Sequence, residues 1–374
     1  MADGVDGPLR HQCARMRLLQ ISDKGAVRER DYPNWNGYVE IYFFSCMGLM
    51  VRSRWLLRKR LGRNGMLAFF AKLPPTVVVI EACGAAHYLA RELGKLGHTV
   101  KLIAPQLVKP YVPRNKNDGR DAEGLCEAAS RPRMRYVPVK TTEQQAALML
   151  LGIREQLVAR RTQLSNMIRG HAAEFGLIEA KGLDKLASFL AAIERDENLA
   201  RELFAMLARE YAQVQVEVKA IEARLLAWHR ADALSRRLAQ IPGVGPVTAA
   251  ALVMKAPDPH AFRSGRLFAA WLGLTPKDHS TAGKTRLGRI TRAGDERLRQ
   301  LLVVGATSVV KQAKARGRGP RWLIELVKRK APKLAAVALA NKIARIAWKL
   351  MTTGESYDGA RIEARTDAQG AAAT

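Results

Sequence analysis

The 374-residue sequence carries 62 lysines and arginines against 34 aspartates and glutamates, a formal net charge of +28. Such an excess of one sign opposes compaction and favours a polyanionic partner, of which nucleic acid is the first candidate. The longest apolar runs, at residues 301–304 and 334–340, are far shorter than a bilayer span. We therefore expect no membrane partner.

The four cysteines are widely spaced without a CxxC pair, which disfavours a disulfide framework and a zinc ribbon. The first residues lack the order of charged, apolar and small residues that marks a secretory signal. We therefore expect a cytoplasmic, nucleoid-associated bacterial protein. Residues 353–374 are Ala, Gly and polar residues without periodicity, and we predict that they form a disordered tail.

Within residues 55–140, short β-branched runs alternate with helical patterns, which predicts an α/β domain with a parallel sheet. The runs lie at residues 76–80, 99–103 and 134–139. Helical patterns lie near residues 88–96 and after Asp118.

Residues 141–232 show no strand signal and predict long coiled-coil helices, able to form an antiparallel hairpin. The first apolar stripe has heptad spacing: Leu150, Ile153, Leu157, Leu164 and Met167. The second has steps of four and three: Leu207, Tyr211, Val214, Val218, Ile221, Leu225 and Trp228. Core packing within one protomer and a dimer stalk both explain such stripes.

Residues 233–352 predict a third, mainly α domain. Its turn at residues 242–245 resembles a helix-hairpin-helix loop, in which Gly243 and Gly245 would let the backbone approach a phosphate. A plain helix-helix turn explains the glycines equally well. The basic run at residues 311–333 favours further phosphate contacts.

Three carboxylates are candidate metal ligands. Glu81 directly follows an apolar strand pattern, and Asp118 and Asp121 share one face of a predicted helix. Hard oxygen ligands that converge from different elements would suit Mg²⁺ in phosphodiester chemistry. Taken singly, the same residues are explained as a helix cap and surface charges.

Ser280 lies in a polar stretch, residues 277–284, followed by Arg286, Arg289 and Arg292. A hydroxyl among cations can become a nucleophile at phosphorus, because the cations stabilise its alkoxide and the charge on the phosphate. An ordinary polar turn is the competing interpretation.

Together these segments resemble the insertion sequence 110 family of transposases, whose relatives include the Piv-type DNA invertases. The resemblance rests on residues 80–88 (IEACGAAHY), 104–111 (APQLVKPY), 115–123 (NKNDGRDAE), 271–276 (WLGLTP) and 279–284 (HSTAGK). It runs in order through about four fifths of the chain.

The resemblance implies a RuvC-like, ribonuclease-H-type N-terminal domain whose four acids, Asp-Glu-Asp-Asp, bind Mg²⁺. A coiled-coil region and a serine-bearing transposase domain follow. Glu81, Asp118 and Asp121 match the last three acids, and Ser280 matches the serine that forms a transient phosphoserine link to DNA.

Members of this family act as oligomers, here expected to be a dimer or tetramer, and share the active site between protomers. They are guided by a structured RNA from their own element, which pairs with donor and target DNA. The resemblance thus implies DNA and guide RNA as partners, and we expect Lys284, Arg286, Arg289 and Arg292 to contact nucleic acid.

Residues 1–54 depart from the family, because they contain no strand of the type Ile-Gly-Ile-Asp-Leu-Ala-Lys that carries the first acid. Asp31 has no strand pattern around it, and the expected position is nearer Tyr38. We hypothesise a frameshift, since one choice of codons for residues 44–48, read one frame over, gives Gln-Leu-His-Gly, which resembles what the family shows shortly after that strand. The coding DNA would reveal it, and the chain would then lack one central strand and one metal ligand.

The sequence thus predicts an RNA-guided DNA transposase or recombinase. Two alternatives remain at this stage. A RuvC-type junction nuclease would use activated water without the serine. A catalytically dead remnant would bind nucleic acid through phosphate contacts without cleaving it.

Overall fold

The computed structural model describes residues 17–23, 38–45, 54–112, 118–178, 182, 185–195, 200–281, 283–317 and 319–359. Side chains are described from Gly65 onward, apart from those at 118, 119, 187, 194 and 195. The predicted tail lies mostly outside these residues. The chain forms two compact units, residues 1–142 and 143–374. The predicted helical region and C-terminal domain therefore share one unit.

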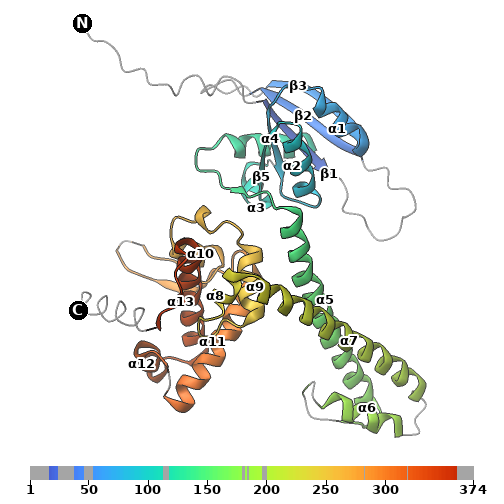
Figure 1. Cartoon of the computed structure of the whole chain (residues 1–374), viewed down its shortest axis with the longest axis vertical. Coiled ribbons are helices and arrows are strands. Elements are labelled where there is room, and N and C mark those ends of the chain that lie inside the picture. Colours follow the sequence, from blue (N-terminus) through green and yellow to red (C-terminus); the bar gives the residue numbers. More distant parts are fainter. Residues whose placement is uncertain are drawn as a thin grey trace. The chain divides into compact units, whose positions relative to one another are not determined.

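The N-terminal unit contains the predicted β–α–β arrangement (Figure 1). Strands β4 (Val77–Glu81) and β5 (Thr99–Ile103) are parallel and are joined by helix α2 (Ala86–Lys95). The third predicted strand, β6 (Tyr136–Val137), pairs antiparallel with β5, so the expectation of a wholly parallel sheet is wrong.

Helices cover both faces of β4. Successive side chains of the strand point to opposite faces, so each face packs against different helices. Val78 and Ile80 pack with α2 and with α1 (Arg63–Ala71). Val79 packs on the other face with α4 (Asp118–Ser130). Two short helices, α3 (Pro105–Val108) and η2 (Lys109–Tyr111), precede α4. The continuous apolar run of β4 is thus buried on both sides.

Three further strands precede this arrangement: β1 (Arg17–Asp23), β2 (Tyr38–Ser45) and β3 (Arg54–Gly62). They form an antiparallel sheet in the order β1-β2-β3, and β1 lies against β4. The expected loss of a central strand depends on the frameshift hypothesis and stays a prediction, because β1 and β4 belong to two separate sheets. β1 ends at Asp23, whose side chain lies outside the described part of the chain.

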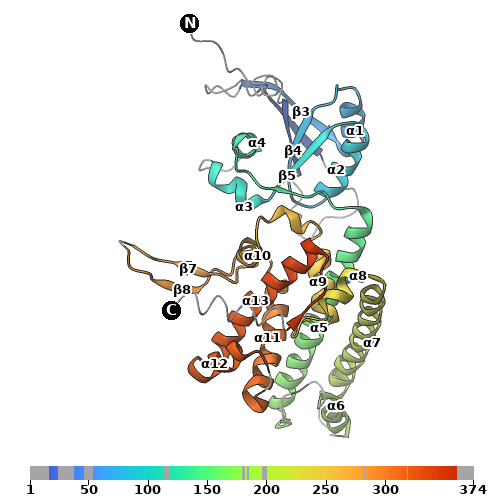
Figure 2. The same ribbon diagram turned by 60° about the vertical axis from the view of Figure 1, so that its left-hand side comes forward.

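The C-terminal unit begins with two long helices that lie side by side (Figure 2), α5 (Thr142–Glu174) and α7 (Arg201–Ala231). They are antiparallel, because Arg154 pairs with Glu222 (2.7 Å) whereas Arg160 pairs with Glu210 (2.6 Å). Helix α6 (Leu186–Arg195) packs against the C-terminal part of α5 and the N-terminal part of α7.

The predicted inner face of α7 is the buried one, since Tyr211, Val214, Val218, Ile221 and Leu225 are all buried. The predicted face of α5 is partly wrong. Ile153 and Met167 are exposed, and the buried apolar residues are Ala147, Leu151, Leu164, Ile168 and Ala172.

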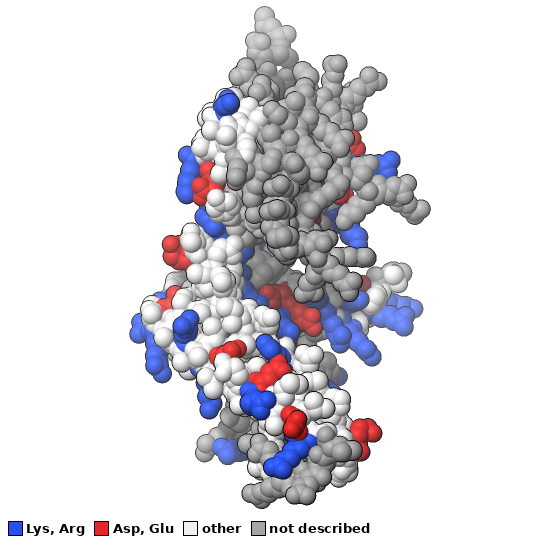
Figure 3. All heavy atoms as spheres, turned by 90° about the vertical axis from the view of Figure 1, so that its right-hand side faces the viewer, with Lys and Arg blue, Asp and Glu red and all other residues white. Residues whose placement is uncertain are grey.

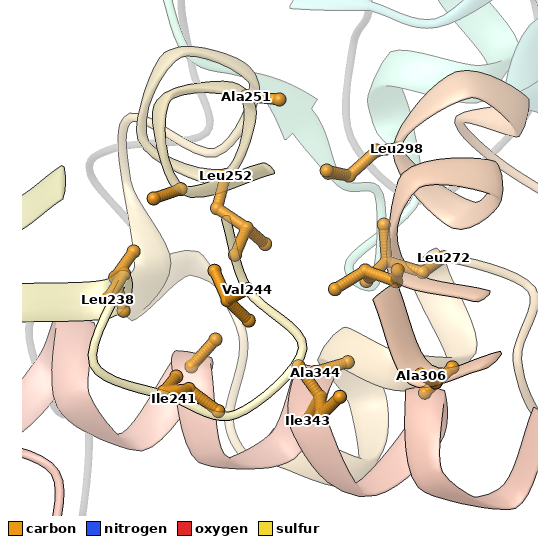
Figure 4. Close-up of a cluster of buried hydrophobic side chains, with 14 of the residues drawn as sticks. Leu238, Ile241, Val244, Ala251, Leu252, Leu272, Leu298, Ala306, Ile343 and Ala344 are labelled. Carbon is orange, nitrogen blue, oxygen red and sulfur yellow. The ribbon is translucent and has the colours of Figure 1, made fainter. Parts of the chain in front are cut away.

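Helices α8 to α13 enclose the largest hydrophobic core of the chain's described part (Figure 4). Their bounds are α8 (Ala233–Leu238), α9 (Pro246–Lys255), α10 (Gly265–Trp271), α11 (Glu296–Arg316), α12 (Arg321–Arg329) and α13 (Pro332–Thr353), with the short helix η3 (Pro259–Ala261) before α10. Residues of α5 and α7, including Leu151 and Leu225, join the same core. This shared core explains why the two predicted regions form one unit.

The turn before α9 packs directly on the backbone of α11. Gly243 has a φ of 86°, which favours glycine, and a Cβ built on Gly305 would lie 1.8 Å from the Gly243 carbonyl oxygen. The turn can approach the helix this closely only because both positions are glycine. Packing therefore accounts for Gly243 and Gly305 without any ligand.

We expect Gly305→Ala to destabilise the folded state by about 2–4 kcal/mol, because the added methyl group overlaps the Gly243 carbonyl. Denaturant unfolding measures this change. Gly152→Ala is the matched control, since Gly152 is a helical glycine in α5 with nothing within 4 Å of a built Cβ. We expect Gly152→Ala to raise the free energy of unfolding by about 0.5–1 kcal/mol. Equal effects of both substitutions would contradict the close contact.

Candidate active site

Ser280 lies on a hairpin that extends away from the helices of its unit (Figure 2). The hairpin consists of β7 (Pro276–Asp278) and β8 (Leu287–Ile290), which pair antiparallel. Its described residues 276–289 are all exposed. The sequence predicted a mainly α domain for residues 233–352 and gave no sign of these two strands, because backbone hydrogen bonds rather than a buried apolar face hold this hairpin.

The base of the hairpin is held by a buried arginine. Arg299 of α11 donates hydrogen bonds through Nη1 to the carbonyl oxygens of Leu272 (3.0 Å) and Ala293 (2.8 Å). Leu272 precedes β7 and Ala293 follows β8, so one side chain joins both ends of the hairpin. Sequence reasoning missed Arg299, because its neighbours Leu298 and Gln300 give no signal that sets it apart from the other arginines of this helix.

Two glycines tighten the same base. Gly273 has a φ of 68°, and a Cβ there would lie 2.3 Å from the carbonyl oxygen of Ala293. A Cβ on Gly294 would lie 1.8 Å from the carbonyl oxygen of Trp271. Only the hydrogen atom of a glycine fits at these two positions. The close backbone contacts therefore hold the base of the hairpin in place.

The Ser280 hydroxyl is held by the opposite side of the hairpin. The backbone N–H of Arg286 donates to Ser280 Oγ at 3.0 Å. The neighbouring His279 N–H donates to the Arg286 carbonyl at 2.9 Å, which keeps the two segments paired. An N–H directed at a hydroxyl oxygen stabilises the negative charge that this oxygen carries once its proton has left.

Asp278 also contacts Ser280, and sequence reasoning did not single it out. The Ser280 N–H donates to Asp278 Oδ1 at 2.8 Å. Hydrogen bonds from the Ser280 side chain and backbone lower the pKa of Asp278 below its ordinary value of 3.8. The signal was available, because an aspartate two residues before a serine commonly forms such a turn.

The four predicted nucleic-acid-binding cations, Lys284, Arg286, Arg289 and Arg292, are all exposed on or beside the hairpin. Arg292 has a φ of 56°, uncommon for a residue with a side chain, and its N–H donates to the Gly273 carbonyl (3.1 Å). Lysines and arginines also project from much of the described surface that Figure 3 shows.

In the described residues, no helix is both long and apolar enough to cross a membrane.

The two glycines of the turn that was predicted to bind phosphate have different surroundings. Gly243 is packed against α11, as shown above, so its conformation serves packing. Gly245 is exposed at the N-terminal end of α9 and has open space around a built Cβ. Of the two glycines, Gly245 is the exposed one, and its contact with phosphate stays a prediction.

The predicted metal ligands lie in the N-terminal unit. Glu81 is the last residue of β4 and is partly exposed. Asp118 begins α4, and Asp121 lies one turn later and is partly exposed. Since the Asp118 side chain lies outside the described set, the convergence of all three carboxylates stays a prediction. Among side chains that are described, no three His, Cys, Asp or Glu residues form a metal-binding group.

The position of α4 is closely defined by its packing. A Cβ on Gly124 would lie 2.7 Å from Val112 Cγ2 and 3.1 Å from the Tyr111 carbonyl oxygen. Buried Ala122 and Leu125 hold the helix on the sheet face of Val79. Carboxylates at the end of β4 and in the first turns of α4 supply the oxygen ligands that a divalent cation prefers, so the residue types fit such an ion.

Comparison with known proteins gives matches in both units. A DEDD transposase family model for IS110 elements matches residues 57–176, and a model for transposases of the IS116/IS110/IS902 family matches residues 235–319. The first match covers Glu81, Asp118 and Asp121, and the second covers the Ser280 hairpin.

Three relatives agree with these matches. A Sinorhizobium fredii protein named "Putative transposase y4pF/y4sB" is 53% identical, over 97% of this chain and 95% of its own length. The transposase for IS1328 of Yersinia enterocolitica is 39% identical over 81% and 91% of the two chains. The transposase for IS1111A of Coxiella burnetii is 38% identical over 84% and 88%.

The β–α–β unit with its carboxylates and the matches together define a DNA transposase of an insertion sequence, with a RuvC-like N-terminal fold. The chain belongs to the IS116/IS110/IS902 family of transposases. The 97% coverage of the Sinorhizobium relative means that most of residues 1–54 align with it, whereas the DEDD match begins at residue 57. The frameshift hypothesis stays a prediction for the coding DNA.

Proposed function

We propose that this transposase cleaves and joins DNA strands with Ser280 as its nucleophile. The observation that carries the proposal is the 3.0 Å hydrogen bond from the Arg286 N–H to Ser280 Oγ, on an exposed hairpin rich in cations. The adjacent Thr281 instead pairs through its backbone, since its carbonyl accepts the Lys284 N–H (3.0 Å). The geometry therefore favours the serine over the threonine.

In the proposed step, Ser280 Oγ forms a bond to a DNA phosphorus while the bond from that phosphorus to a sugar oxygen breaks. The serine proton ends on the departing sugar oxygen, so atoms and charge balance. The Arg286 N–H stabilises charge on Oγ, and Lys284, Arg286, Arg289 and Arg292 neutralise the phosphates around it. A second sugar hydroxyl reverses the step and joins the strands.

We assign Mg²⁺ binding to Glu81, Asp118 and Asp121, on the basis of their carboxylate chemistry and their places at the end of β4 and the start of α4. When bound, such an ion neutralises charge on the reacting phosphate. Gly245 at the start of α9 and the basic side chains of α11 and α12 would contact phosphates. The +28 charge suits a protein that carries a structured guide RNA and DNA together, as a dimer or tetramer.

Covalent trapping tests the proposed chemistry. The protein is incubated with element-end DNA, the flanking transcript of the element and Mg²⁺, and is then separated on a denaturing gel. We expect a protein–DNA adduct whose peptide map places a phosphate on Ser280. An adduct on another residue, or strand cleavage without any adduct, would contradict the nucleophile assignment.

A further inference from the structure

Ser280 is held from two directions on the hairpin. Its backbone N–H donates to Asp278 Oδ1 (2.8 Å), and its Oγ accepts the N–H of Arg286 (3.0 Å) from the other side. The first bond fixes the backbone of the serine, and the second fixes the oxygen of its side chain. The residue that would react is thus ordered although it is exposed.

We infer that Asp278 is a positioning residue for Ser280: its carboxylate oxygen holds the serine backbone in the turn that presents Oγ to the Arg286 N–H. This inference rests on the proposed function of Ser280. Orientation of this kind matters because small misplacements of a reacting group lower a rate strongly.

The alternative role for Asp278 is to accept the serine proton. A general base works best when its pKa lies near the operating pH. The hydrogen bonds from Ser280 move the pKa of Asp278 in the opposite direction, below 3.8, which makes the carboxylate a weak base. The 2.8 Å hydrogen bond from the Ser280 N–H needs an acceptor oxygen at this position, and it needs no transfer of a proton.

Asp278→Ala and Asp278→Asn separate these roles. Asparagine keeps an oxygen that can accept the Ser280 N–H but has no negative charge, whereas alanine has neither. We expect Asp278→Ala to slow adduct formation about 10–100-fold at saturating DNA. Asp278→Asn should stay within about threefold of the unchanged protein, because the turn is retained. DNA affinity and the thermal midpoint should not change in either variant.

Asp258→Ala is the matched control. Asp258 accepts the His260 N–H at 3.0 Å in the same kind of turn, also on the surface, but outside the hairpin. We expect this variant to form the adduct at the unchanged rate. If Asp278→Asn were as slow as Asp278→Ala, or if Asp278→Ala had no effect, positioning by Asp278 would be wrong.

A second measurement does not depend on activity. In protein labelled with ¹⁵N-serine, exchange of the Ser280 amide proton with solvent should be faster in Asp278→Ala and stay slow in Asp278→Asn, because asparagine can still accept this hydrogen bond. Equally fast exchange in both variants, or unchanged exchange in both, contradicts the hydrogen bond. Loss of the adduct in the unchanged protein would overturn the proposed function of Ser280, whereas the amide measurement would still decide whether Asp278 holds the serine.

Discussion

Ser280→Ala should abolish the covalent protein–DNA adduct and slow strand joining on the order of 10⁴-fold, because it removes the attacking oxygen. The substitution should leave folding intact. The Arg286 N–H that loses its acceptor is exposed and can bond to water instead. Adduct yield, strand-joining rate and DNA affinity, measured on the same preparation, check this expectation.

Thr281→Ala is the control for Ser280→Ala, because Thr281 carries the neighbouring exposed hydroxyl and accepts the Lys284 N–H through its backbone carbonyl. We expect its joining rate to stay within about twofold of the unchanged protein. Full cleavage by Ser280→Ala would instead favour a RuvC-type nuclease that uses activated water. That result would remove the serine from the mechanism while leaving the family assignment in place.

The sequence predicted the elements whose patterns have a single physical explanation. The run at residues 77–80 is wholly apolar, and it became β4 because both of its faces are buried. The inner face of α7 was also predictable, since its apolar residues form one narrow stripe. In α5, by contrast, four consecutive apolar residues at 148–151 fit several helix faces. Contact with α7 and the C-terminal core decides between them, and a local pattern cannot show that contact.

The hairpin that carries Ser280 was not predictable as strands. Its residues are exposed and polar, so the alternation that marks a half-buried strand is missing. What fixes it is the base: Arg299 bonded to two carbonyls, with Gly273 and Gly294 in close backbone contact. These contacts join the two ends of the hairpin to each other and to α11, which a local sequence pattern does not show. Sequence resemblance therefore identified Ser280, and the spacing of Asp278 from it is typical of a local turn, but the contacts of Arg299 became visible only in the folded structure.

Glu81→Gln should lower Mg²⁺-dependent cleavage on the order of 10²-fold or more, because an amide is a much poorer ligand for a hard cation than a carboxylate. Glutamine has nearly the same size, and Ala82 beside it keeps its backbone hydrogen bond to the Ile103 carbonyl (2.8 Å). DNA affinity should therefore be preserved or rise slightly as one negative charge is lost. Cleavage measured across a Mg²⁺ titration, together with binding, checks both expectations.

Glu92→Gln is the matched control, since Glu92 lies on α2 of the same unit and pairs with Lys95 at 2.8 Å. A surface pair of this kind contributes little to stability, so we expect unchanged cleavage. If Glu81→Gln cleaves as well as Glu92→Gln, the carboxylate at the end of β4 is not a metal ligand. If the unchanged protein does not cleave at any Mg²⁺ concentration while its DNA binding weakens with salt, the chain is a binding remnant. The sequence feature that would account for such a loss is that residues 1–54 contain no match to the family strand that carries the first acid.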